Sequence, residues 1–228
     1  MLVGMDSRSH HVHDFSVHGS TVLLESPILA VRQDRVEMPG GTVSNREIVE
    51  HFGAVAVVAV DEHGRLPLVQ QYRHSVGRRL WELPAGLLDI AGEDEVTGAQ
   101  RELLEEAGLL AESWSVLVDL VTSPGFCDES VRVFLATSLR EGEQPAAPDD
   151  EEADMDHQWV SIEEAVAMIM SGQIVNSIAI AGIFAAAEVL SGRAEARPVS
   201  VPFDLRPHSL AQRRIDSGIV PDLKRLPR

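Results

Sequence analysis

The segment Gly86–Leu109, with the sequence GLLDIAGEDEVTGAQRELLEEAGL, carries the densest chemical signal in this chain. Three carboxylates, those of Glu102, Glu105 and Glu106, follow Arg101 within two helical turns. Like charges at such spacings repel each other and lower the stability of a helix. A bound cation would remove this cost, so the segment predicts a helix that binds metal in a phosphate enzyme.

The helical positions of the glutamates place them at the edge of a core-facing surface. At about 100° per residue, Glu102 and Glu106 project from one face, and Glu105 lies to one side of it. Oxygen ligands of this kind suit Mg²⁺ or Mn²⁺, which keep several waters and bind phosphates beside one or two carboxylates. The alternative is a solvated acidic helix face. Against that alternative stands a neighbouring apolar stripe, which consists of Val96, Ala99, Leu103 and Ala107.

From Glu93 onward the segment resembles the signature of the Nudix hydrolase family. That signature reads Gly, five residues, Glu, seven residues and then Arg-Glu-apolar-x-Glu-Glu-x-Gly-apolar, and it forms a loop, a helix and a loop. Gly108 occupies the glycine position that ends the helix. The chain departs from the pattern at its start, because six residues rather than five separate Gly86 from Glu93. The added residue precedes the helix, so the spacing of the ligands on the helix is unchanged.

The resemblance implies a set of metal ligands. Glu102 and Glu106 would bind the cation directly, and Glu105 would be a further ligand or a partner of one. The main-chain carbonyl of Ala85 matches a position that supplies another oxygen.

Arg101 has two compatible interpretations. By resemblance it orients the glutamates through charge-assisted hydrogen bonds. Equally, it could form a structural salt bridge to Glu93.

Motifs on both sides of the signature resemble the ADP-ribose pyrophosphatase branch of the family. They are Trp81–Gly86 (WELPAG), Ser123–Gly125 (SPG) and Asn176–Ala181 (NSIAIA). The similarity extends from Arg46 to Leu190 and implies hydrolysis of ADP-ribose, a nucleoside diphosphate, to AMP and ribose 5-phosphate.

Two alternatives stay open. One is a pyrophosphatase of nucleotide sugars or other nucleoside diphosphate derivatives. The other is a Nudix-fold sensor that binds ADP-ribose without cleaving it. A sensor would be expected to lose a helix glutamate or to carry a DNA-binding segment, whereas this acidic chain keeps all three glutamates.

The substrate contacts implied by the resemblance lie outside the helix. Arg46 and Arg73 match arginines that hold the phosphates or the terminal ribose, although each could instead form a surface ion pair. Leu87 would line the same pocket. The loop residues implied to approach the substrate are Ser123, Pro124, Gly125 and Glu129.

The general base is expected in the acidic segment Pro148–Asp154, PDDEEAD. The segment lies between a predicted strand that begins at Ser130 and one that contains Trp159, which matches the mobile base loop of the family. The resemblance favours Glu151, with Glu152 next, and a shift of one residue would exchange them. From composition alone, a solvated charge run is the alternative.

Composition and charge restrict the partners. The 228 residues, 44% of them hydrophobic, predict one sizeable core with a smaller appended element. A single cysteine fits a reducing compartment, and neither a signal-type segment nor a membrane-spanning apolar run is recognised, so we expect a cytoplasmic protein without a membrane partner. A net charge of -17 argues against a nucleic-acid partner. Divalent cations would reverse the local field and allow an anionic substrate to approach.

The order of patterns predicts an α/β fold, a Nudix-type α/β/α sandwich with a mixed β-sheet, preceded by a small N-terminal β element. Residues 1–45 would form an N-terminal tail and this element, residues 46–192 the Nudix hydrolase domain, and residues 193–228 an extended C-terminal tail. In the family the N-terminal element is swapped between subunits, so the resemblance implies a homodimer. Predicted strands cover residues 47–60, 66–72, 115–122 and 130–137, and predicted helices follow the capping residues Ser161 and Asn176.

Overall fold

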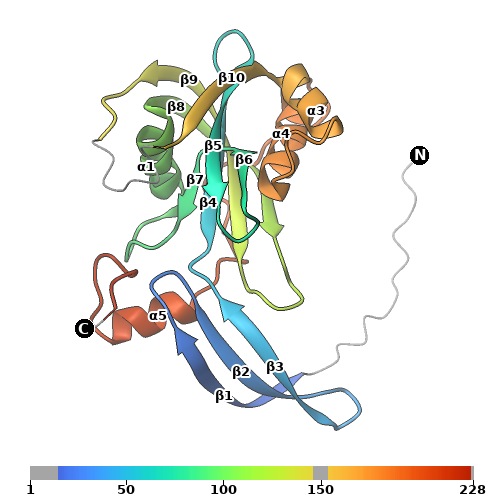
Figure 1. Cartoon of the computed structure of the whole chain (residues 1–228), viewed down its shortest axis with the longest axis vertical. Coiled ribbons are helices and arrows are strands. Elements are labelled where there is room, and N and C mark those ends of the chain that lie inside the picture. Colours follow the sequence, from blue (N-terminus) through green and yellow to red (C-terminus); the bar gives the residue numbers. More distant parts are fainter. Residues whose placement is uncertain (1–14, 146–153, 227–228) are drawn as a thin grey trace.

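The computed structural model describes residues 15–145 and 154–226. An N-terminal antiparallel sheet, with strand order β1-β2-β3, forms the lower part of the molecule in Figure 1. Its strands are β1 (Ser16–Glu25), β2 (Ala30–Glu37) and β3 (Val43–Glu50). This sheet corresponds to the predicted N-terminal β element, although the predicted boundary after residue 45 falls inside β3.

A mixed four-stranded sheet with the order β7-β4-β9-β8 forms the centre of the upper part. Strand β4 pairs in parallel with β9, whereas the β4–β7 and β8–β9 pairs are antiparallel. The strands are β4 (Ala54–Ala59), β7 (Ala85–Leu87), β8 (Leu109–Val121) and β9 (Ser130–Glu141).

Helices cover both faces of this sheet. Along β4 the side chains alternate: Val55 and Val57 belong to the core beneath α1 (Glu95–Ala107), and Val58 belongs to the core beneath α4 (Ser177–Leu190). Because β4 is buried on both faces, it is a continuous apolar run. Helix α3 (Ile162–Met170) packs beside α4. These three layers confirm the predicted α/β sandwich.

A second antiparallel sheet, with the order β10-β5-β6, completes the upper part. It consists of β5 (Arg65–Arg73), β6 (Arg78–Glu82) and β10 (Asp156–Ser161). Strand β6 ends at Glu82 and β7 begins at Ala85, so the chain passes from this sheet into the signature segment within a few residues. No helix within the described ranges is both long and apolar enough to cross a membrane.

One predicted strand is divided in the structure. The sequence indicates a single strand over residues 47–60, but β3 ends at Glu50 and β4 begins at Ala54. Gly53 lies between them with a φ of 79°, a left-handed conformation that interrupts a strand. The interruption lets β3 and β4 belong to different sheets.

The C-terminal segment is not the extended tail that the sequence predicts. It contains a helix, α5 (Ser209–Asp216), that packs against the N-terminal sheet. Leu210 is fully buried with Phe52, and Arg213 forms ion pairs with Glu25 and Glu50. The prolines that suggested an extended chain flank α5 rather than interrupt it, because Pro207 precedes it and Pro221 follows it.

Candidate active site

Helix α1 is fixed at both ends by residues of the signature. The Asp94 side chain caps its first turn by accepting a hydrogen bond from the Thr97 amide. Gly108 ends it in the left-handed conformation, with a φ of 65°. Ala99 and Leu103 are fully buried against the central sheet, so the rotation of the helix is set by its packing.

That rotation turns the acidic face of α1 toward β7. The backbone amide of Ala85 donates a hydrogen bond of 2.9 Å to Oε2 of Glu106. Glu102 is 8% exposed and lies against Gly86, where an added Cβ would overlap its carboxylate. The structure therefore brings together Ala85, Gly86, Glu102 and Glu106, although the extra residue lengthens the loop that follows Gly86.

Burial perturbs both carboxylates. Desolvation, with repulsion from Glu105 and Asp89, raises the pKa of Glu102 to about 7, against the opposing charge of Arg101. Desolvation, with repulsion from Glu102, raises the pKa of Glu106 to about 8. Two neighbouring carboxylates that resist ionisation at neutral pH form a site that a divalent cation would stabilise.

Arg101 makes both of the contacts considered for it. Its guanidinium donates to the two oxygens of Glu93 at 3.1 and 3.2 Å. The same group donates to Glu102 at 2.5 Å and to Glu105 at 3.0 Å, and it also donates to the carbonyl of Leu87 at 3.3 Å. Although burial opposes its charge, the carboxylates of Glu93 and Glu102 raise the pKa of Arg101 further above its ordinary value. Arg101 thus links the start of the signature to its helix.

A divalent cation fits the donor set, but the acids are engaged with protein groups. Within the described residues, no three His, Cys, Asp or Glu side chains already form a complete metal site. Arg101 donates hydrogen bonds to Glu102 and Glu105, and the Ala85 amide donates one to Glu106. Mg²⁺ needs only one or two carboxylates, with waters and phosphate oxygens completing its shell. Glu102 and Glu106 can supply these two carboxylates.

Arg73 belongs to the same region through its partner Glu82, which was not among the predicted site residues. Its guanidinium donates to the two carboxylate oxygens of Glu82 at 3.0 and 2.6 Å. Its positive charge also acts on Glu106, where it opposes the rise in pKa. Glu82 is 4% exposed. Glu82 is part of the WELPAG motif, and this motif is the sequence feature from which it could have been predicted.

The loop after β8 lies at the same end of the central sheet as Leu87. Residue Ala54 pairs with Leu87 on one side and with Val131 on the other, and Val131 pairs with Leu120 of β8. This register brings the loop of residues 122–129 to the end of the sheet where Leu87 leaves it.

Within this loop, Ser123 and Glu129 are fixed by hydrogen bonds. The Ser123 carbonyl accepts from the amides of Phe126 and Cys127, and Glu129 accepts from the Thr122 hydroxyl at 2.5 Å. Pro124 and Gly125 are exposed at the tip. Nothing in the sequence pointed to His51, whose Nε2 lies 3.5 Å from Oε1 of Glu129.

Arg46 lies on the N-terminal sheet rather than beside α1. It is an exposed residue of β3, opposite Asp34 of β2. Its guanidinium contacts the carbonyl of Asn45 and the sulfur of Met38. Figure 1 shows that this sheet is separate from the layer that contains α1.

Glu151 and Glu152, the predicted bases, lie outside the described residues. The residues that flank them contact elements of the site. Gln144 donates a hydrogen bond of 2.5 Å to the carbonyl of Glu105 on α1, and Asp154 forms an ion pair with Arg79 on β6.

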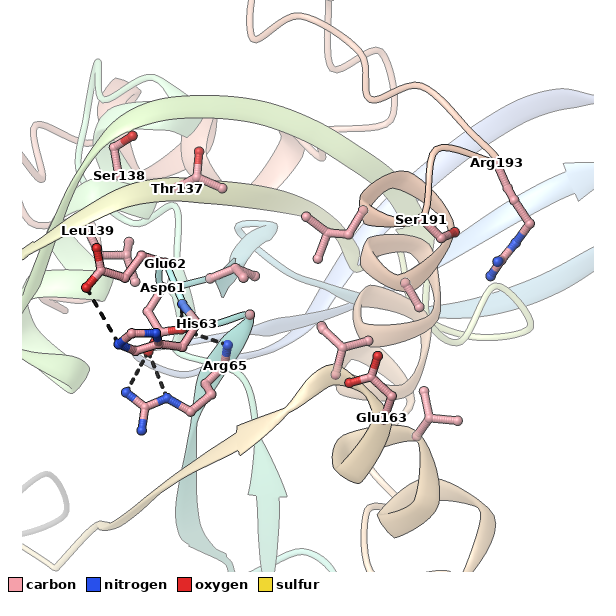
Figure 2. Close-up of a pocket in the computed structure, with 16 residues that line it drawn as sticks. Asp61, Glu62, His63, Arg65, Thr137, Ser138, Leu139, Glu163, Ser191 and Arg193 are labelled. Atoms are coloured by element: carbon pink, nitrogen blue, oxygen red, sulfur yellow. Dashed lines mark hydrogen bonds and ion pairs between the residues drawn. The ribbon is translucent and has the colours of Figure 1, made fainter.

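A groove at the opposite end of the sheet has a different character. The groove has a volume of about 1270 Å³ and lies between the turn after β4, the end of α4 and the start of α3. Figure 2 shows the residues that line it. Its arginines are already paired, Arg65 with Asp61 and Arg193 with Glu188. None of the residues predicted for the site lines it. The predicted metal ligands Ala85, Glu102 and Glu106 lie instead where α1 faces β7.

Comparison with known families and proteins shows which proteins this chain is similar to. The model of the NUDIX domain matches residues 50–176, and that of the nucleoside diphosphate sugar hydrolase N-terminal domain matches residues 16–49. An ADP-ribose pyrophosphatase of Mycobacterium tuberculosis is 55% identical over 204 residues, which cover 90% of this chain and 98% of the relative. An ADP-ribose pyrophosphatase of Bacillus subtilis is 37% identical over 68% of this chain and 83% of its own length.

A solved structure supports the fold. The crystal structure of an ADP compounds hydrolase superposes with a TM-score of 0.69 and covers 82% of this chain and 99% of its own. At 19% sequence identity, this likeness concerns the architecture alone.

Proposed function

Because the chain belongs to the Nudix hydrolase family, we propose that it hydrolyses the diphosphate bond of ADP-ribose, giving AMP and ribose 5-phosphate. The observation that carries this proposal is the pair of carboxylates, the buried Glu102 and the half-buried Glu106, that α1 turns toward β7. The substrate is supported by the M. tuberculosis relative, because the identity of 55% extends over nearly its whole length.

The reaction requires a divalent cation, as Nudix hydrolases do in general, and we propose Mg²⁺, with Mn²⁺ as an alternative. Glu102 and Glu106 would hold it together with the carbonyl of Ala85, and Glu105 would be a further ligand or a partner of one. When bound, such a cation neutralises charge on the diphosphate and lowers the pKa of a bound water. Arg101 orients Glu102 and Glu105 for this task through its hydrogen bonds.

The remaining groups act on the substrate and the water. A water oxygen bonds to one phosphorus while the bridging P–O bond breaks, and the leaving phosphate keeps the electron pair. Glu151, or Glu152 beside it, would accept the proton of the water. The contacts of Gln144 with α1 and of Asp154 with Arg79 on β6 support this proposal. The proposed substrate contacts are Arg46, Arg73, Leu87, Ser123, Pro124, Gly125 and Glu129.

We also propose a cytoplasmic homodimer in which the N-terminal sheet contacts a second copy. The strand β1 is exposed along its whole length, and it displays apolar side chains such as Val17, Leu23 and Leu24, which are 59, 55 and 50% exposed. An apolar strand surface of this kind marks an interface more often than a solvated face. Arg46 lies away from α1 of its own chain, and in such a dimer it would contact substrate in the active site of the second copy. Light scattering at several protein concentrations tests the dimer, and a monomer at all of them would rule it out.

A second substrate class has one specific observation in its favour. The match of residues 16–49 to the N-terminal domain of nucleoside diphosphate sugar hydrolases supports a nucleotide sugar as the substrate. Both candidates share the diphosphate and the same cation site, and they differ in the group beyond the second phosphate.

Turnover on a panel of diphosphates separates these functions. With Mg²⁺ present, ADP-ribose should have a higher kcat/KM than nucleotide sugars, and the products should be AMP and ribose 5-phosphate. A nucleotide sugar with the higher kcat/KM would favour the second substrate class. Absence of hydrolysis for every compound, with ADP-ribose still bound, would instead indicate a sensor.

A further inference from the structure

The C-terminal segment pairs with the loop that carries the extra residue of the signature. The amide of Leu223 donates a 2.9 Å hydrogen bond to the carbonyl of Asp89, and the amide of Ala91 donates a 2.8 Å bond to the carbonyl of Pro221. Ile90 and Asp222 form the antiparallel bridge between these bonds. Two segments more than a hundred residues apart in the chain therefore form a short ladder beside the site.

Packing holds this ladder in place. The Leu223 side chain is 2% exposed and lies in a small core with Phe52 and Leu210 of α5. Leu87, the last residue of β7, packs against the same core. The ladder is thus continuous with the strand that faces Glu102 and Glu106.

At the end of the ladder, Lys224 reaches a buried carboxylate. Its Nζ lies 2.6 Å from Oδ2 of Asp89, whose side chain is only 5% exposed. The other oxygen of Asp89 lies 3.9 Å from the guanidinium of Arg101. Asp89 therefore has two cationic neighbours, and one of them is the arginine that orients the helix glutamates.

Lys224 and Arg101 both offset the negative charge of Asp89, so the loss of one would affect the other. A carboxylate this buried is strongly destabilised without a cation. If Lys224 were absent, Arg101 would be the remaining cation within 4.0 Å of Asp89 among the described residues. A closer approach of Arg101 to Asp89 would loosen its bonds to Glu102 and Glu105.

We propose that Lys224 is a positioning residue for the cation site, acting by neutralising Asp89 so that Arg101 remains on Glu102 and Glu105. This inference rests on the proposed metal-dependent hydrolysis and adds to it a residue from the C-terminal segment. Groups one step removed from a metal ligand typically change metal affinity or activity by about 10- to 100-fold when they are mutated.

The test compares variants by Mn²⁺ affinity, measured by electron paramagnetic resonance on the folded protein without substrate. Lys224→Met should weaken Mn²⁺ binding by about 10-fold. Lys224→Arg should restore most of it. The matched control is Arg225→Met, because Arg225 is in the same segment with a side chain 78% exposed and should leave the affinity unchanged.

A second substitution identifies Asp89 as the intermediary. In the double variant Lys224→Met with Asp89→Asn, no buried charge is left unpaired, so Mn²⁺ affinity should return to within about three-fold of the original protein. This variant also provides the test if Lys224→Met alone does not fold. Unchanged affinity in folded Lys224→Met, or a double variant that binds as weakly as the single one, would overturn the proposal.

Kinetics then separate this proposal from the proposed function. In a protein that hydrolyses ADP-ribose, Lys224→Met should lower kcat by a larger factor than it raises KM. High Mg²⁺ should restore part of the lost kcat. If the original protein hydrolyses no diphosphate, the proposed function fails, whereas the Mn²⁺ comparison still decides the role of Lys224.

Discussion

The backbone amide of Ala85 donates a hydrogen bond of 2.9 Å to the carboxylate of Glu106, and this bond joins the short strand β7 to helix α1. It brings the residue whose carbonyl is proposed as a ligand next to a glutamate that is proposed as a ligand. The bond also leaves Glu106 with an acceptor role that does not depend on its charge.

The substitution Glu106→Gln removes the charge of this side chain but keeps an oxygen that can accept the hydrogen bond. The amide oxygen of Gln can still accept from Ala85, so the fold should persist, while the loss of a charge that stabilises the cation should reduce kcat by at least about two orders of magnitude. Thermal unfolding and kcat at saturating Mg²⁺ provide the two measurements. Near-normal turnover would remove Glu106 from the ligand set.

Gly86→Ala tests the close approach of β7 to α1. An added Cβ would overlap the carboxylate of Glu102, so the strand or the glutamate must move, and we expect a loss of both Mn²⁺ affinity and kcat of about 10-fold or more. Gly40→Ala is the matched control, because a Cβ at Gly40 has no heavy atom within 4 Å. Equal behaviour of the two variants would show that this contact does not matter to the site.

Arg101→Lys should separate charge from geometry. A lysine keeps the positive charge but cannot hold Glu93 in the bidentate manner of Arg101 while also reaching Glu102. We expect a fall in kcat of about 10-fold or more together with a lower midpoint of thermal unfolding. The same change at Arg193, whose bidentate pair with Glu188 is exposed, should leave the midpoint of thermal unfolding nearly unchanged. If the two substitutions have similar effects, Arg101 has no special positioning role.

The metal-free protein should lose stability as the pH rises. The folded pKa of Glu102 is about 7 and that of Glu106 about 8, both above the ordinary value of 4.5. Between pH 4.5 and 8 the folded state therefore holds more protons than the unfolded chain. Each group then lowers the free energy of unfolding by up to about 1.4 kcal/mol per pH unit. Stabilisation from these groups is complete below pH 4.5 and is lost as the pH passes through their folded pKa values.

Denaturant unfolding in the presence of a chelator measures this slope. Glu106→Gln should flatten it, since one of the two titrating groups is gone. Added Mg²⁺ should stabilise the protein more at pH 8 than at pH 5, because metal ligands must be deprotonated to bind. A slope that is identical in the two proteins would contradict a raised pKa of Glu106 in the folded state.

Local patterns predicted the parts of the site that depend on local geometry. Helix α1 ends at Gly108, as its position in the signature indicates, and its stripe of Ala99 and Leu103 is buried because both lie on one helical face. The carboxylates Glu102 and Glu106 follow from the same spacing. The sandwich fold followed from the order of strands and helices together with the family resemblance.

Contacts between distant segments were beyond the reach of the sequence. The division of β3 from β4 at Gly53 was missed because the apolar run beginning at Ala54 continues the pattern of the strand before it. The helix α5 was missed because prolines dominate the segment around it. The ion pair of Lys224 with Asp89 depends on that helix, and no spacing in either segment indicates it.

The most direct test of the account is the anomalous diffraction of a crystal grown with Mn²⁺ and a non-hydrolysable ADP-ribose analogue. We expect an anomalous peak at coordination distance, about 2.1 Å, from carboxylate oxygens of Glu102 and Glu106, with the diphosphate bound to the same ion. A fully bound analogue with no peak beside either glutamate would contradict the claim that Glu102 and Glu106 hold the catalytic cation.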